Sequence, residues 1–247
     1  TFPMFVKPAR EGTGMGMDTK SIVHNEIELR ERVQWVVHSY QQPALVENYL
    51  PGREFTVGVL GRSDAAQWSP RPELYQNNGF HRFPILELNS SQSITPGVYG
   101  HEAKTFLPGE VGAPKYTCPA HIDEELADEL FNLAVRGHNA IGALDVSRVD
   151  IRLDAEGKPR LLEINALPGL TPDFSDLCLS ANAEGISYTD LILEILYLGA
   201  SRWNLMVPPQ EAMGIPIPSK KFMRPVQVLA QRNRHTRLSF NKLPQTR

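Results

Sequence analysis

Three oxygen-bearing side chains are the most informative residues in this 247-residue sequence. Asp150 lies in the segment SRVDIRLD, and Glu163 and Asn165 follow in the segment LLEIN. Carboxylate and amide oxygens are hard ligands, and a small set that leaves coordination positions open suits a Mg²⁺ ion that also binds phosphate oxygens. The chemistry that these residues could support is therefore the handling of phosphate groups with a divalent cation.

A predicted β-hairpin would position these three side chains. Residues 146–153 and 160–165 have strand character around a DAEG turn, and successive strand side chains point to opposite faces. Asp150, Glu163 and Asn165 would then share one face, together with Leu161, whereas Leu162 would point to the core. The alternative is a surface ladder in which Asp150 pairs with a neighbouring arginine. An Asn beside a Glu at a strand end is a poor choice for a β-strand, which favours the cation site.

A glycine-rich loop near the N-terminus is a candidate phosphate site. Lys7 ends a predicted strand at 4–7, where its ammonium could reach a phosphate as a point charge. The loop at 10–17 has the sequence REGTGMGM, and its glycines would let backbone N–H groups approach phosphate oxygens closely. An ordinary hairpin connection is the alternative. The candidate residues in this loop are Glu11, Gly12, Thr13, Gly14 and Gly16.

Two predicted strands at 44–50 and 55–60 follow, with a Pro-Gly turn between them. The segment formed by Glu47, Asn48, Tyr49 and Leu50, together with Glu54, could line a cleft in which backbone groups contact a base and a carboxylate contacts ribose hydroxyls. Solvent-facing acids at strand ends are the alternative for both glutamates. Lys104 lies in a long loop at 89–117 able to cover a site, and a solvated lysine is the alternative there.

Helices are predicted where caps precede apolar residues at helical spacing. Asn25 and Glu28 form a capping pair before the first helix, and Asp123 precedes a second one that extends to about Gly142. A final helix begins after Ser187 and stops at Gly199. Residues 63–82 are polar and contain scattered Pro and Gly, so they are interpreted as an insertion or long loop.

Composition limits the class of protein without naming a partner. A hydrophobic fraction of 41% and a net charge of −3 indicate a globular chain with no global attraction to nucleic acid or membrane. Two separated cysteines and the lack of any membrane-span or signal-peptide pattern favour a cytoplasmic protein. Residues 201–247 contain nine Lys or Arg and one acid, so we expect a poorly ordered basic tail. A basic segment that binds an acidic partner is the alternative.

Taken in order, these motifs resemble the D-alanine–D-alanine ligase family of ATP-grasp enzymes. The resemblance rests on FVKPAREGTGMGM, LVENYLPGREFTVGVLG, HEAK, TCPA, SRVDIRLD and LLEINALPGLT, and it covers residues 1 to about 200. It implies an α/β (α+β) ATP-grasp fold with two antiparallel or mixed sheets and the nucleotide in the cleft between them. The implied division is a central subdomain at 1–53 and a catalytic subdomain at 54–200.

The resemblance also implies roles for individual residues. Lys7 and Lys104 would contact ATP phosphates, the loop at 12–16 would close over them, residues 47–50 would contact adenine, and Glu54 would hold ribose. Two Mg²⁺ ions, with Mn²⁺ as an alternative, would bind to Asp150, Glu163 and Asn165. Arg148 and the Gly169 amide would stabilise oxyanions, and Ser175 would hold the substrate carboxylate, although the alignment there needs a shift of one residue.

The implied reaction joins two D-alanines for peptidoglycan precursors, with ADP release and an acyl-phosphate intermediate. In the family an N-terminal domain precedes the VKP strand, so this chain is expected to be a piece of a longer protein, with a homodimer through that domain as one option. Thr13-Gly14 and Thr105 stand where the family commonly has a serine pair and a tyrosine. Another carboxylate–amine or depsipeptide ligase, and a non-catalytic Mg-ATP-binding fragment, are therefore the alternatives.

Overall fold

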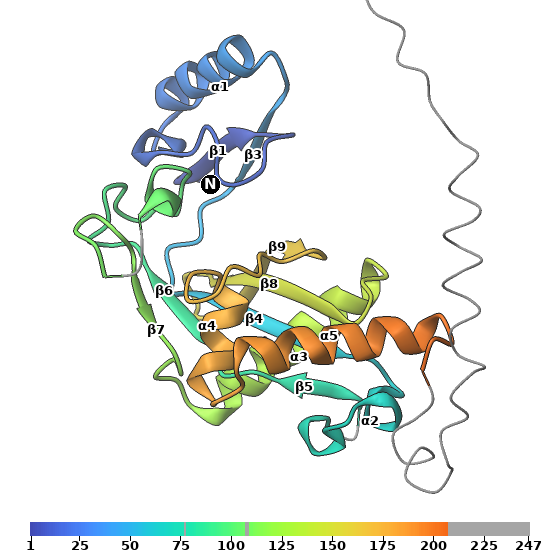
Figure 1. The fold of residues 1–247 in the computed structure, drawn as a ribbon. Coiled ribbons are helices and arrows are strands. Elements are labelled where there is room, and N and C mark those ends of the chain that lie inside the picture. Colours follow the sequence, from blue (N-terminus) through green and yellow to red (C-terminus); the bar gives the residue numbers. More distant parts are fainter. Residues whose placement is uncertain (77, 107–108, 207–247) are drawn as a thin grey trace, which may run out of the picture.

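The computed structural model describes residues 1–76, 78–106 and 109–206. Its strands form two separate sheets in which every pairing is antiparallel (Figure 1). The expected α/β fold with two sheets is confirmed. The strands on either side of residues 49–53 belong to different sheets, whereas the division into subdomains at residue 54 stays a prediction. The predicted basic tail lies outside the described residues from residue 207 onward.

The smaller sheet has the order β2-β1-β3, with β1 (Met4–Pro8) between β2 (Ile22–Val23) and β3 (Ala44–Asn48). Helix α1 (Glu26–Tyr40) packs on one face of it. The helix begins where predicted, because the Asn25 side chain accepts hydrogen bonds from the backbone N–H groups of Ile27 and Glu28. The face of the sheet opposite α1 forms one wall of a cleft, with Phe5, Lys7 and Glu47 lining it.

The larger sheet has the order β7-β6-β4-β8-β9 and contains the predicted hairpin. Strand β4 (Glu54–Gly61) lies at its centre beside β8 (Val146–Leu153), which pairs with β9 (Pro159–Asn165). The outer strands are β6 (Leu86–Asn89) and β7 (Lys115–Thr117), and β5 (Phe80–Arg82) pairs with the far end of β4. The sheet thus carries the residues of the hairpin at one edge.

Helices cover both faces of the larger sheet (Figure 1). Helix α3 (Glu124–Ala140) packs against Phe55, Val57 and Val59 on one face. Helices α4 (Asp176–Ala183) and α5 (Tyr188–Arg202) pack on the other, with the short helix α2 (Ala65–Trp68). None of the helices in the described part of the chain is long and apolar enough to cross a membrane.

Gly58 in β4 allows α4 to approach the sheet closely. A Cβ atom at Gly58 would lie 2.6 Å from Cδ1 of Leu177 in α4, a distance that side chains do not adopt. Leu177 is 1% exposed, and burying a leucine side chain contributes about 1.5–3 kcal/mol. Because Gly58 pairs with Arg148 of β8, this packing brings the N-terminus of α4 to Arg148.

Several expectations about secondary structure are wrong. Residues 63–82 are not one long loop, because they contain α2, a 3₁₀ turn at Pro72–Leu74 and β5. The segment predicted as a long loop at 89–117 ends in strand β7. Helix α4 was not predicted, since its eight residues lack a strong apolar periodicity. Helix α5 continues past Gly199 to Arg202.

Candidate active site

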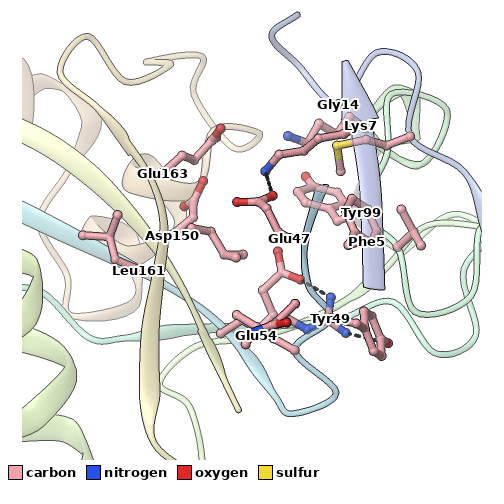
Figure 2. A pocket seen from close by; sticks show the side chains of 17 residues that line it. Phe5, Lys7, Gly14, Glu47, Tyr49, Glu54, Tyr99, Asp150, Leu161 and Glu163 are labelled. Atoms are coloured by element: carbon pink, nitrogen blue, oxygen red, sulfur yellow. Dashed lines mark hydrogen bonds and ion pairs between the residues drawn. The ribbon is translucent and has the colours of Figure 1, made fainter. Parts of the chain in front are cut away.

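A pocket with a volume of about 180 Å³ lies between the two sheets. Figure 2 shows Lys7 and Glu47 of the smaller sheet on one side and Asp150 and Glu163 of the larger sheet on the other. The covering loop, which we define as residues 90–106 and 109–114, supplies Tyr99 to the same pocket. The other residues lining it are Phe5, Gly14, Met17, Asn48, Tyr49, Leu50, Glu54, Val98, Lys104, Arg152, Leu161 and Leu162.

The hairpin brings the three predicted oxygen ligands together. Asp150 and Glu163 are direct cross-strand neighbours in β8 and β9. The Asn165 amide nitrogen lies 3.4 Å from Oδ2 of Asp150 and 3.1 Å from Oε1 of Glu163. Two carboxylates side by side on a sheet face repel each other, so the arrangement needs positive charge nearby.

A β-bulge in β9 changes the expected orientation of the residues before Glu163. The register shifts between Asp150 and Ile151, so Leu161 pairs with Ile151 instead of Arg152. The Leu161 side chain reaches Gly137 of α3, on the core side. The prediction that Leu161 shares the face of Asp150 is therefore wrong, because strict alternation does not anticipate an extra residue.

Asp150 is buried and held by hydrogen bonds. It is 9% exposed and accepts from the Thr56 hydroxyl at 2.9 Å and from Nε and Nη2 of Arg148 at 3.0 and 2.8 Å. Burial raises the pKa of Asp150, against the opposing effect of Arg148. The alternative prediction is that Asp150 pairs with a neighbouring arginine on the protein surface. Asp150 does pair with Arg148, but the pair is largely buried in the cleft and is not solvated.

Asp176 at the start of α4 is a third acid near Arg148, and sequence analysis missed it. Its Oδ2 lies 3.3 Å from Nη1 of Arg148, and its pKa is raised by burial. Arg148 therefore lies among three carboxylates, since Glu163 is also within 3.6 Å of its Nη2. The acids exceed the guanidinium in charge, which makes this end of the pocket favourable for a cation.

The residues fit a magnesium ion that shares its coordination with a phosphate ligand. Within the ranges that the structure describes, no group of three or more His, Cys, Asp or Glu side chains could hold a metal alone. Asp150 and Glu163 offer carboxylate oxygens, and Asn165 would offer its amide oxygen after a rotation of the side-chain amide, whose nitrogen now faces both acids. Few protein ligands completed by phosphate oxygens are characteristic of Mg²⁺.

Glu54 and Arg152 form the opposite end of the pocket. The Glu54 carboxylate lies 3.3 Å from Nη1 of Arg152, and both side chains are largely buried. Burial raises the pKa of Glu54 to about 7, while the positive charge of Arg152 opposes that rise. A carboxylate at this depth is suited to accept hydrogen bonds from ligand hydroxyl groups.

Basic side chains approach the pocket from both the smaller sheet and the covering loop. The Lys7 ammonium lies 2.6 Å from Oε2 of Glu47, as Figure 2 shows. The Lys104 ammonium lies over the Tyr99 ring, 4.7 Å from its centre. The His101 N–H donates to the Gly14 carbonyl at 3.0 Å, so the covering loop is joined to the glycine-rich loop. Gly14 has φ of +72°, which a glycine adopts without strain.

Some predicted site residues do not line the pocket. In the glycine-rich loop, Glu11 accepts a hydrogen bond from Gln42, and Gly12, Thr13 and Gly16 lie outside the pocket lining. Ser175 accepts from the Thr171 N–H at 2.9 Å and lies against Gly169, so these two residues form a local turn before α4. Their roles stay predictions.

The site includes residues that sequence analysis did not assign to it: Arg152 and Tyr99 line the pocket, whereas Thr56 and Asp176 contact Asp150 and Arg148 beside it. Alternation from Asp150 could have identified Arg152, and the pairing of β4 with β8 places Thr56 opposite Asp150. Tyr99 and Asp176 could not have been found in this way, because they come from a loop and a helix whose positions depend on tertiary packing.

Comparisons with known proteins identify the family. Residues 1–197 match the family model described as D-ala D-ala ligase C-terminus. "Uncharacterized protein y4sG" of Sinorhizobium fredii is 36% identical over 202 residues, which cover 82% of this chain and 53% of that protein. A D-alanine–D-alanine ligase of Bordetella petrii is 33% identical over 195 residues, which cover 78% of this chain and 51% of that protein. The chain thus spans about half the length of the curated relatives it matches.

A solved structure supports the fold. The D-alanine–D-alanine ligase of Bacillus anthracis complexed with ATP superposes with a TM-score of 0.57 at 22% identity, over 82% of this chain and 54% of that one. At this identity the likeness shows a shared fold, in which two sheets flank a cleft. Together with the family model, which matches residues 1–197, these findings show that the chain belongs to the D-alanine–D-alanine ligase C-terminal family.

Proposed function

We propose that this chain binds Mg-ATP in the cleft and that the whole protein is an ADP-forming ligase that joins two D-alanines for cytoplasmic peptidoglycan precursor synthesis. The observation that carries the proposal is the pair formed by buried Asp150 and its cross-strand neighbour Glu163, which faces Lys7 across the pocket (Figure 2). Acids that need a cation and a lysine that can bind phosphate are the two halves of a Mg-nucleotide site. The named ligase activity of the Bordetella petrii relative supports the substrate class.

Each part of the pocket has a place in the proposed nucleotide complex. Glu54 accepts hydrogen bonds from the ribose hydroxyls, and the backbone of residues 47–50 contacts adenine. Lys7 and Lys104 bind phosphate oxygens, with the N–H groups of the glycine-rich loop. Lys7 exchanges its contact with Glu47 for the phosphates, since its side chain is only 25% exposed and already lies in the pocket lining.

The proposed reaction has two steps and needs no side-chain nucleophile. The carboxylate of the first amino acid attacks the γ-phosphorus, and the bond from this phosphorus to the bridging oxygen of ADP breaks. The amine of the second amino acid then attacks the acyl phosphate, releasing phosphate and a proton as the amide forms. Arg148 and the Gly169 N–H stabilise the oxyanions in both steps.

Asp150, Glu163 and Asn165 would hold the metal in this reaction. When bound, Mg²⁺ supplies neutralisation of the phosphate charge. Arg148 lies 2.8 Å from Asp150, so it is next to the proposed metal ligands and can reach the same phosphoryl group. A second ion, Mn²⁺ as a substitute and a homodimer through a further N-terminal domain are separate predictions.

Measuring ADP release by the full-length protein tests the proposed activity. The panel comprises D-alanine, D-serine, D-lactate and the corresponding L-compounds, each with ATP and Mg²⁺. We expect the highest rate with D-alanine alone. A higher rate with an L-amino acid would exclude the proposed substrates, and Mg-dependent ATP binding without any ADP release would favour a non-catalytic nucleotide-binding protein.

A further inference from the structure

Arg152 makes an unusually complete set of polar contacts in the pocket wall. Its Nε donates to the Gly52 carbonyl at 3.1 Å, and its Nη1 donates to the Gly97 carbonyl at 3.2 Å. The same Nη1 lies 3.3 Å from Oε2 of Glu54, and Nη2 lies 3.4 Å from the Tyr49 hydroxyl. The guanidinium also lies against the Tyr49 ring, 5.4 Å from its centre. Four chain positions thus converge on one side chain.

These acceptors belong to the segments that surround the pocket. Tyr49 and Gly52 lie in the connection between the two sheets, and Gly97 lies in the covering loop. The connection is fixed to β8 because the Gly52 N–H donates to the Leu153 carbonyl at 3.0 Å. A Cβ at Gly52 would lie 2.6 Å from that carbonyl oxygen, so only glycine allows this approach. The Gly52 carbonyl that orients Arg152 is therefore itself held in place.

The geometry requires arginine and not merely a positive charge. The planar guanidinium donates along several fixed directions, so one group can contact two backbone carbonyls and a carboxylate simultaneously. A lysine ammonium is a single point at the end of a flexible stem. Glu54 is buried, and Arg152 is the cation within salt-bridge distance of it among the described residues. The carboxylate consequently depends on Arg152 for both its charge and its direction.

We propose that Arg152 is a positioning residue that aims Glu54 at the ribose hydroxyls of the bound nucleotide. The Gly52 and Gly97 carbonyls fix the guanidinium, and the guanidinium fixes the carboxylate. This inference rests on the proposed nucleotide site and adds a determinant of selectivity for a ribose diol. Its consequence is specific, because loss of Arg152 should weaken binding of nucleotides that carry the 2′- and 3′-hydroxyls much more than binding of nucleotides that lack them.

The test measures ATP and 2′,3′-dideoxy-ATP binding by isothermal titration calorimetry with Mg²⁺ present. We expect Arg152→Met to raise the Kd for ATP about tenfold, as is usual for a residue that orients a direct ligand contact, and the Kd for dideoxy-ATP less than about twofold. Arg152→Lys should give an intermediate effect. Arg160→Met is the matched control, because Arg160 pairs with Arg152 across β8 and β9 but is itself exposed and contacts Asp154 at the hairpin turn.

Glu54→Gln separates the inference from the function on which it rests. In the wild type we expect ATP to bind more tightly than dideoxy-ATP, and Glu54→Gln should reduce this preference. Adding Arg152→Met to Glu54→Gln should then change the preference for ATP over dideoxy-ATP little further. Equal weakening of both nucleotides by Arg152→Met and Arg152→Lys would overturn the inference while leaving the nucleotide site intact. If the wild type binds neither nucleotide, the proposed function fails as well.

Discussion

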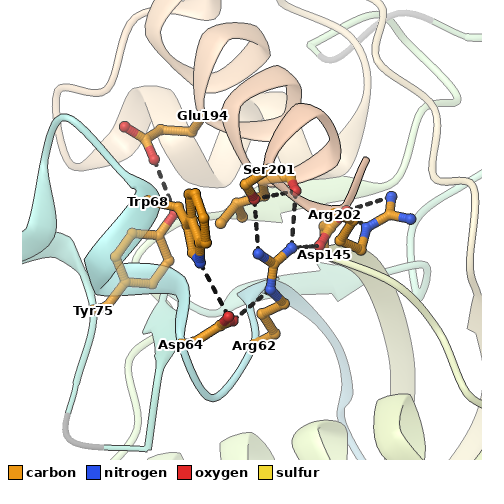
Figure 3. Close-up of polar contacts among 9 residues, drawn as sticks. Arg62, Asp64, Trp68, Tyr75, Asp145, Glu194, Ser201 and Arg202 are labelled. Atoms are coloured by element: carbon orange, nitrogen blue, oxygen red, sulfur yellow. Dashed lines mark hydrogen bonds and ion pairs between the residues drawn. The ribbon is translucent and has the colours of Figure 1, made fainter. Parts of the chain in front are cut away.

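Two polar clusters in this protein each contain two buried acids but differ in how completely their charges are paired. The α5 cluster consists of Arg62, Asp145, Arg202, Tyr75 and Glu194, which Figure 3 labels, together with Ser69. Asp145 lies 3.0 Å from Arg62 and 2.6 Å from Arg202, so one acid has two guanidinium partners. Glu194 accepts from the hydroxyls of Ser69 and Tyr75. Each buried acid is matched by groups of the protein itself.

The cleft cluster, which we define as Arg148, Asp150, Glu163 and Asp176, has the opposite balance. Three acids share one guanidinium. Burial raises the pKa values of Asp150 and Asp176, because removing a carboxylate from water disfavours its charged form. A buried ionic group without sufficient pairing lowers stability, so its presence is better explained by a ligand than by folding.

The comparison separates a structural ion network from a binding site. The α5 cluster joins α5 to the start of β8 and is complete without a ligand. The cleft cluster is incomplete and faces a pocket that also contains lysines. Substitutions in the first cluster should therefore affect folding, and substitutions in the second should affect ligand binding.

The largest expected effect is that of Asp150→Asn on nucleotide binding. Removing one of two carboxylate ligands should lower the affinity for ATP in the presence of Mg²⁺ about 100-fold or more, whereas the midpoint of thermal unfolding should change little. Isothermal titration calorimetry with and without Mg²⁺ provides the measurement. An affinity equal to that of the wild type would remove the distinction between the two clusters.

Asp145→Asn should give the reverse result. Asp145 has φ of +61°, which asparagine tolerates, so the substitution removes charge without adding backbone strain. We expect the free energy of unfolding to fall by about 3 kcal/mol, because Arg62 and Arg202 lose their shared partner. Urea unfolding followed by circular dichroism tests this. The Kd for Mg-ATP should stay within about twofold of the wild-type value, and a larger change would show that the α5 cluster also controls the pocket.

Glu54, a further, largely buried acid of the pocket, should make the stability of the protein depend on pH. Because burial raises the folded-state pKa to about 7, the folded protein binds a proton more tightly than the unfolded chain. The stability that this proton contributes is complete below about pH 4.5 and is lost as pH rises through about 7. Between pH 5 and pH 8, the wild type should lose about 2 kcal/mol relative to Glu54→Gln. If the free energies of unfolding of the wild type and of Glu54→Gln changed in parallel with pH, this expectation would be contradicted.

The smallest expected effect concerns Asp176, the acid that holds the other side of Arg148. Asp176→Asn should raise the Mg²⁺ concentration needed for half-maximal ATP binding about fivefold to tenfold, since it removes nearby negative charge and one anchor of Arg148. Asp190→Asn, at the first turn of the exposed start of α5, is the matched control for loss of a helix N-terminal acid. An equal effect of both substitutions would indicate a general influence on the fold.

The sequence predicted those features that depend on local rules. Alternation in β8 and β9 grouped Asp150, Glu163 and Asn165, and capping residues located α1, α3 and α5. The alternation rule failed at Leu161, because one extra residue at the bulge in β9 turns the side chains before the bulge to the other face of the sheet. Sequence analysis also missed Asp176, because this acid reaches Arg148 only through the close packing of α4 on Gly58. Such contacts join segments that are distant in sequence and carry no local pattern.

The most direct test of the account is a calorimetric titration of ATP into the wild-type protein and into Asp150→Asn and Asp145→Asn, each with Mg²⁺ and with EDTA. The account predicts Mg-dependent binding by the wild type and by Asp145→Asn, and loss of the Mg²⁺ effect only in Asp150→Asn. Binding by all three proteins that is equal with Mg²⁺ and with EDTA would contradict a magnesium-nucleotide site at the cleft cluster.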